Sequence, residues 1–150
     1  TIGIGVGSFL CEKLSHHTIR PSLIILGALG MTFFGIDFAL TSSSFVPVEV
    51  LFSSTTFWHI LIDLTLIALF GGLFSVPLYA IMQSQSDPAF RSRIIAANNI
   101  LNALFMVLGA VLTMVLLDAS WQIPEVFLSA AIGTGIIATW IACVLHKRLD

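Results

Sequence analysis

The stretches FWHILIDLTLIALFGGLFSVPLYAIMQ (57–83) and IIAANNILNALFMVLGAVLTMVLL (94–117), joined by the polar segment SQSDPAFRSR (84–93), decide the fold. A helix rises about 1.5 Å per residue and the hydrocarbon core of a bilayer is about 30 Å thick, so about 20 apolar residues cross it. Both apolar stretches exceed that length. They therefore predict two membrane-spanning helices joined by a short loop.

The composition of the whole chain supports a membrane protein. Hydrophobic residues make up 57% of the sequence and charged residues only 9%, whereas about a quarter of the residues in a soluble domain are charged. We predict an all-α membrane protein with five spans, at about 1–15, 21–40, 57–83, 94–117 and 126–145. The first is short for a span, so we expect that the chain is part of a larger protein with further helices upstream.

The basic residues predict the orientation of these spans. All six lysine and arginine residues fall at three places, which are Lys13 and Arg20, Arg91 and Arg93, and Lys147 and Arg148. The segments between these places carry acidic but no basic residues. Because basic loops stay on the cytoplasmic side, we expect the three basic places, and with them the C-terminus, to be cytoplasmic.

Small residues predict where helices pack. Gly3 and Gly7 are four residues apart and share a helix face, and Ala131, Gly135 and Ala138 form a similar stripe. In lipid, small residues let helix backbones approach closely. A nucleotide-binding glycine loop is the alternative for the first pair, but it needs a preceding strand and a downstream acid.

Two local signals concern the hairpin itself. Gly71, Gly72 and Pro77 predict a kink in the first arm, since proline removes an intrahelical hydrogen bond. Asp87 and Pro88 suit the N-cap and the first position of the second arm.

Ionisable residues inside a span are costly and are therefore functional candidates. Asp63 is the deepest acid, and His59 lies four residues earlier on the same helix face, where the two side chains can pair. The alternative for Asp63 is a structural hydrogen bond to a neighbouring helix. Asp37 lies within about one turn of the outer end of its span and can reach water. A structural role and a functional role are therefore equally good interpretations of Asp37.

Amides form a second polar group. Asn98 and Asn102 share one face near the inner end of the fourth span, and Tyr79 lies at a similar distance from the inner end of the third. Buried amides need partners, so this face must look toward other helices or a polar cavity. Hydrogen bonding that only joins helices is the alternative.

No residue pattern indicates catalysis. The sequence shows no nucleophile with a base, no metal cluster and no phosphate loop, so we predict no enzyme activity, metal or cofactor, and no nucleic-acid partner. Kinked helices with polar groups inside the membrane are typical of transporters.

The segments SVPLYAIMQSQSDPAFRSRIIAANNILNALFMV (75–107) and GSFLCEKLS (7–15) resemble the major facilitator superfamily, and within it the bacterial lysophospholipid transporters, some of which are fused to an acyltransferase and an acyl-ligase. The chain would match helices 8 to 12 of that fold, part of its C-terminal six-helix bundle. The resemblance implies flipping of lysophosphatidylethanolamine across the bacterial inner membrane by alternating access. It also implies two partners, the N-terminal half of the protein and a fused or associated acyltransferase.

The resemblance also implies roles for single residues. It favours a place in the substrate path for Asp63, Tyr79, Asn98 and Asn102. It makes such a place less favoured for Asp37. The superfamily's cytoplasmic loop motif aligns on Glu12 and Lys13, but it is degenerate here, with serine at 8 and 15 in place of glycine and histidine at 16 and 17 in place of the basic pair. The candidates for a cytoplasmic gate are Glu12, Lys13, Arg91 and Arg93.

Two other functions remain open. One is a different exporter of the superfamily, for drugs or metabolites. The other is a membrane anchor for a fused phospholipid acyltransferase.

Overall fold

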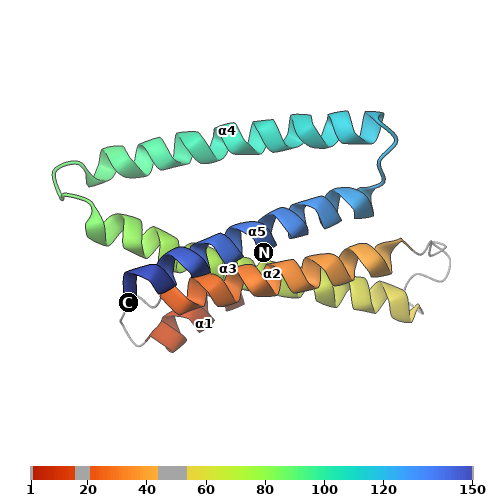
Figure 1. The fold of residues 1–150 in the computed structure, drawn as a ribbon, viewed down its shortest axis with the longest axis horizontal. Coiled ribbons are helices and arrows are strands. Elements are labelled where there is room, and N and C mark those ends of the chain that lie inside the picture. The colour runs from red at the N-terminus through yellow and green to blue at the C-terminus, as the bar shows by residue number, and fades with distance from the viewer. Residues whose placement is uncertain (1, 16–20, 44–53, 150) are drawn as a thin grey trace.

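The computed structural model describes residues 2–15, 21–43 and 54–149. These residues form five helices and no strand, which confirms the all-α prediction. The helices are α1 (Ile2–Ser15), α2 (Pro21–Ser42), α3 (Thr55–Gln85), α4 (Arg91–Asp118) and α5 (Ile123–Leu149) (Figure 1). Four of them, α2 to α5, are long and apolar enough to cross a membrane.

The helices divide into a packed group and a separate arm. Helix α3 packs against α1 and α2, and α2 packs against α5. Helix α4 runs apart from this group and touches α5 only slightly (Figure 1). None of its residues is buried. We call α1, α2, α3 and α5 the packed group.

Successive long helices run in opposite directions (Figure 1). The last turns of α3 and α5 and the first turn of α4 therefore lie at one end of the molecule. We call it the basic end, because Arg91 and Arg93 begin α4 there. The opposite end, where α4 ends at Asp118 and α5 begins near Glu125, we call the acidic end.

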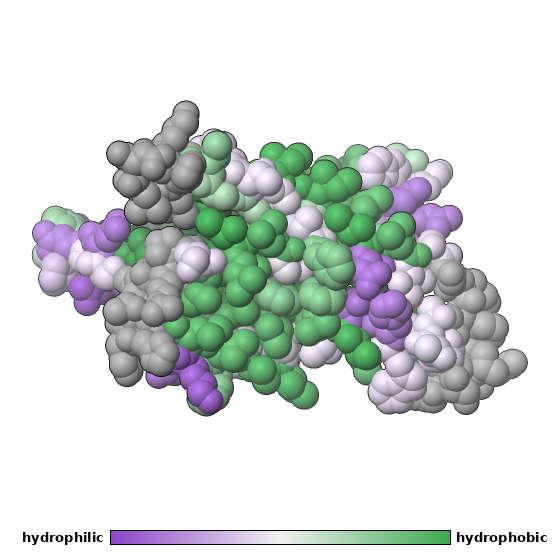
Figure 2. All heavy atoms as spheres, turned by 60° about the horizontal axis from the view of Figure 1, so that its bottom comes forward, coloured by the Kyte–Doolittle hydropathy of each residue, from purple (hydrophilic) through white to green (hydrophobic). Residues whose placement is uncertain are grey.

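The molecular surface is banded. Figure 2 shows hydrophobic residues across the middle of the face in view, with hydrophilic residues gathered toward both ends. Large exposed side chains such as Phe33, Phe105, Met106 and Trp140 contribute to the apolar surface of the molecule. An apolar middle with polar ends suits a protein embedded in a bilayer.

Glycine brings α1 and α3 together, as the spacing of Gly3 and Gly7 predicts. Both residues face α3, and a Cβ added to Gly7 would overlap the backbone carbonyl of Leu69. From the other side, a Cβ on Gly72 would lie 2.8 Å from the carbonyl oxygen of Ile4. The two backbones are therefore in direct contact, and a larger side chain at Gly7 or Gly72 would force them apart.

The small-residue stripe of α5 packs on α2. Ala131 and Ala138 are buried, and a Cβ on Gly135 would lie 2.9 Å from Cγ2 of Thr32. The small-residue stripe visible in the sequence therefore lies at a helix contact.

Helix α3 runs without interruption from Thr55 to Gln85, with Pro77 buried inside it. The proline therefore does not end the helix, and the kink predicted at this position stays a prediction. Gly72, which the sequence assigns to the kink, instead serves the close contact with α1.

The predicted cap of α4 is wrong. The helix begins at Arg91, and its N-cap is Phe90 rather than Asp87. The Asp87 carboxylate accepts a hydrogen bond from the backbone N–H of Ala89 at 2.9 Å, and its carbonyl accepts one from Phe90 at 2.9 Å. The aspartate is thus used within its own turn, and the helix starts after that turn.

Candidate functional site

Tyr79, Asn98 and Asn102 form one polar cluster, which we call the amide cluster. Asn102 Nδ2 donates a hydrogen bond to the Tyr79 hydroxyl oxygen at 2.8 Å, and Asn98 Nδ2 lies 3.4 Å from the same oxygen. The two asparagines are one helical turn apart on α4, so both reach the single tyrosine of α3. This confirms that the three side chains lie at the same level along α3 and α4.

A pocket of about 240 Å³ lies beside the amide cluster, between α3 and α4. At about 30 Å³ per water molecule, it has room for a small polar group. The amide cluster forms its polar wall, and the rest of the lining is largely apolar, namely Phe74, Ser75, Leu78 and Met82.

The lining of this pocket favours a ligand that is polar at one end and apolar at the other. Each asparagine offers two N–H donors and one carbonyl acceptor, and the tyrosine offers one hydroxyl. The N–H groups can donate to a phosphate oxygen, and the amide carbonyls can accept from an ammonium group. The residues that line the pocket carry no charge, so binding here would rest on hydrogen bonds and apolar contact.

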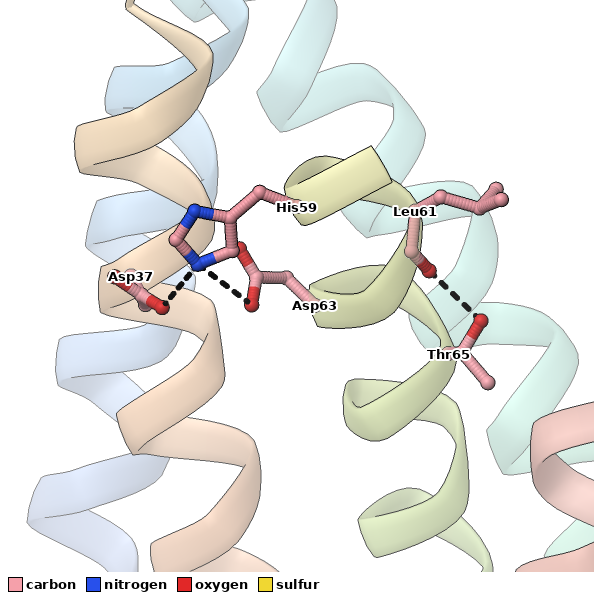
Figure 3. A network of polar contacts seen from close by, with 5 residues as sticks. All are labelled: Asp37, His59, Leu61, Asp63 and Thr65. Atoms are coloured by element: carbon pink, nitrogen blue, oxygen red, sulfur yellow. Dashed lines mark hydrogen bonds and ion pairs between the residues drawn. The ribbon is translucent and has the colours of Figure 1, made fainter. Parts of the chain in front are cut away.

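A second polar cluster consists of Asp37, His59 and Asp63, and we call it the acid–histidine cluster. His59 Nε2 lies 3.1 Å from Asp37 Oδ2 and 3.9 Å from Asp63 Oδ1. Figure 3 shows Asp37 on α2 and the two other side chains on α3, with all three pointing toward one another. The predicted pairing of His59 with Asp63 is confirmed, and Asp37 is an additional partner.

The cluster is open on one side and closed on the other. The side chains of Asp37 and His59 are 37% and 49% exposed, whereas Asp63 is 1% exposed. Oxygen Oδ2 of Asp63 is buried and has no hydrogen-bond partner. A buried carboxylate oxygen without a partner costs free energy, and a bound ligand would lower that cost.

The proposed path residues do not gather at one place. Asp63 precedes Tyr79 by 16 residues on α3, which separates the two by about 24 Å along a helix. The structure therefore divides the four candidates between the two clusters. Asp37, which the resemblance demotes, contacts the same histidine as Asp63.

The four gate candidates lie near the basic end, on α1 and α4. Glu12, Lys13, Arg91 and Arg93 are all exposed, and within the described ranges no ion pair joins the first two to the last two. The guanidinium of Arg93 lies 5.8 Å from the ring centroid of Phe90. The histidines at 16 and 17, which replace the basic pair of the loop motif, fall outside the described residues.

No family model, curated protein or solved structure matches the chain.

Proposed function

We propose that this chain is part of a membrane transporter that moves an amphiphilic lipid, and that the amide cluster binds the polar group of that lipid. The observation that carries the proposal is the pocket between α3 and α4, where three neutral polar side chains meet an apolar wall. A polar group placed within apolar helices favours a path through the membrane over a purely structural bundle.

The exposed surface of α4 supports a lipid rather than a small polar solute. Beyond the amide cluster, α4 continues with large apolar side chains that are mostly exposed, among them Leu101, Phe105 and Met106. An acyl chain can lie along such a surface while its headgroup occupies the pocket. The proposed ligand therefore has one polar head and one apolar chain.

We take the substrate and the cellular setting of this proposal from the resemblance of the sequence to lysophospholipid transporters of the major facilitator superfamily. The substrate is lysophosphatidylethanolamine, flipped from the outer to the inner leaflet of a bacterial inner membrane. The basic end lies in the cytoplasm, where an acyltransferase reacylates the product. The N-terminal half of the same protein supplies the opposite wall of the substrate path.

The proposal is tested by flipping of labelled lysophosphatidylethanolamine in proteoliposomes that contain the full-length protein, with a diacyl phosphatidylethanolamine as the control lipid. We expect inward movement of the lysolipid only. The double variant Asn98→Ala/Asn102→Ala removes both amides of the cluster. Thr134→Val is the matched control, because the Thr134 hydroxyl donates only to the Ala130 carbonyl of its own helix.

Each alternative has its own outcome. Movement of drugs or metabolites without movement of lysolipid would assign the chain to another class of exporter and overturn the lipid proposal. A folded protein that moves no substrate but is required for acyltransferase activity would identify a membrane anchor. Equal movement of the diacyl lipid would contradict selection of a single-chain lipid.

A further inference from the structure

The acid–histidine cluster lacks a compensating positive charge. Asp37 and Asp63 bring two carboxylates to one imidazole, so with both acids ionised the cluster stays negative whether or not His59 is protonated. No lysine or arginine occurs between Arg20 and Arg91, and hence none occurs on α2 or α3. Uncompensated charge between apolar helices is costly, which favours a cation bound from solution.

The geometry suits a metal ion. One ligand atom from each of Asp37, His59 and Asp63 can be chosen so that all three lie within 4.8 Å of one another. Metal–ligand bonds of about 2.0–2.2 Å in tetrahedral geometry place ligand atoms about 3.4 Å apart. The 3.1 Å and 3.9 Å separations from His59 Nε2 are already close to that value. Small side-chain rotations would complete the site.

The burial of the cluster also fits a ligand site. Asp63 is 1% exposed and its Oδ2 has no partner, while its carboxylate points toward His59 (Figure 3). His59 and Asp63 are one helical turn apart, which is the spacing of paired ligands in helical metal sites. The exposed edges of Asp37 and His59 leave an entry route and room for a water ligand.

The donor set selects the class of ion. Mg²⁺ and Ca²⁺ prefer oxygen ligands only, whereas an imidazole with carboxylates suits Zn²⁺ and its first-row neighbours. We propose that Asp37, His59 and Asp63 form a site for a divalent transition-metal ion such as Zn²⁺, which joins α2 to α3 near the acidic end. This site is independent of the identity of the transported substrate.

The test is Zn²⁺ binding to the full-length protein in lipid nanodiscs, purified without a polyhistidine tag and followed by isothermal titration calorimetry and thermal unfolding. We expect a Zn²⁺-dependent rise in Tm and a site that Mg²⁺ does not fill. Asp63→Asn and His59→Gln should each weaken Zn²⁺ binding at least tenfold and abolish the Tm shift. The half-exposed His59 keeps the test decisive even if the Asp63 variant fails to fold.

Two controls separate this site from other ligands in the chain. The double variant His16→Gln/His17→Gln removes the adjacent histidines of the α1–α2 connection, and Glu125→Gln removes an exposed acid of the acidic end. Both should bind Zn²⁺ like the wild type. Unchanged Zn²⁺ affinity in His59→Gln, or preferential binding of Mg²⁺ by the wild type, would overturn the proposal.

Discussion

The packed group and the arm α4 are both largely apolar but differ in how they pack. In the packed group, glycine and alanine lie at each helix contact, as at Gly7 against α3 and Ala131 against α2. Helix α4 contains the most apolar 18-residue stretch of the four candidate spans and has no buried residue. A Cβ added to Gly109 of α4 would meet no atom of another helix within 4 Å.

This difference indicates that hydropathy does not decide which helices pack together. Lipid tails are as apolar as leucine, so an apolar surface alone gives no preference for a neighbouring helix over lipid. Close backbone contact gives that preference in the packed group. The polar contact of α4 is instead the hydrogen bonding of its amides to Tyr79.

The largest expected effect is on the stability of the packed group. Gly7→Leu should destabilise the protein by about 3 kcal/mol, at the upper end for an overpacked contact, because the new side chain would collide with the backbone of Leu69. The matched variant Gly109→Leu should change stability by less than about 0.5 kcal/mol. Thermal unfolding in nanodiscs measures both, and equal losses would remove the distinction between the two regions.

The next effect is on transport through the arm. Asn98→Ala/Asn102→Ala removes both hydrogen-bond donors to Tyr79 and should slow lysolipid flipping at least tenfold, a barrier increase of about 1.4 kcal/mol. Membrane insertion and expression should be retained, because α4 is not part of the packed group. Loss of expression instead would show that the amides only join helices.

A smaller effect is expected from Tyr79→Phe. The substitution removes the hydroxyl that both asparagines contact and keeps the ring. Because the amides can then bind water in the pocket, the flipping rate should fall only about threefold, or about 0.7 kcal/mol. Initial rates in proteoliposomes measure the change. A loss as large as that of the double variant would place the tyrosine hydroxyl itself on the lipid headgroup.

The smallest effect concerns the basic end. Glu12→Gln should change the free energy of unfolding by less than about 0.5 kcal/mol, because Glu12 is exposed and has no ion pair with Arg91 or Arg93. Denaturant unfolding measures this change. A loss above 1 kcal/mol would show that these residues lock the cytoplasmic end in the intact protein.

The sequence predicts those features of the fold that depend on one helix at a time. Apolar length predicts the helices, and the four-residue spacing of Gly3 and Gly7 predicts a packing face. The pairing of His59 with Asp63 follows from the same spacing. These features need no knowledge of which helices are neighbours.

Contacts between helices were harder to predict. The meeting of Asp37 with His59 depends on α2 and α3 being antiparallel neighbours. The sequence does hold a signal for this contact. Asp37 lies five residues before the end of α2 and Asp63 eight residues after the start of α3, so both acids lie near the same end of an antiparallel pair. The separation of Asp63 from the amide cluster also follows from helix length once Asp63 and Tyr79 are both placed on α3. The prediction that Asp87 is the N-cap of α4 was wrong because its carboxylate accepts a hydrogen bond within the preceding turn.

The most direct test of the transport proposal is photolabelling with lysophosphatidylethanolamine that carries a photoreactive group on its headgroup. We predict that the label attaches to the lining of the pocket between α3 and α4, within 74–82 and 98–102, and that unlabelled lysolipid competes for it. Labelling spread over the apolar surface of α4 without competition, or confined to residues of the packed group outside 74–82, would contradict a headgroup site at the amide cluster.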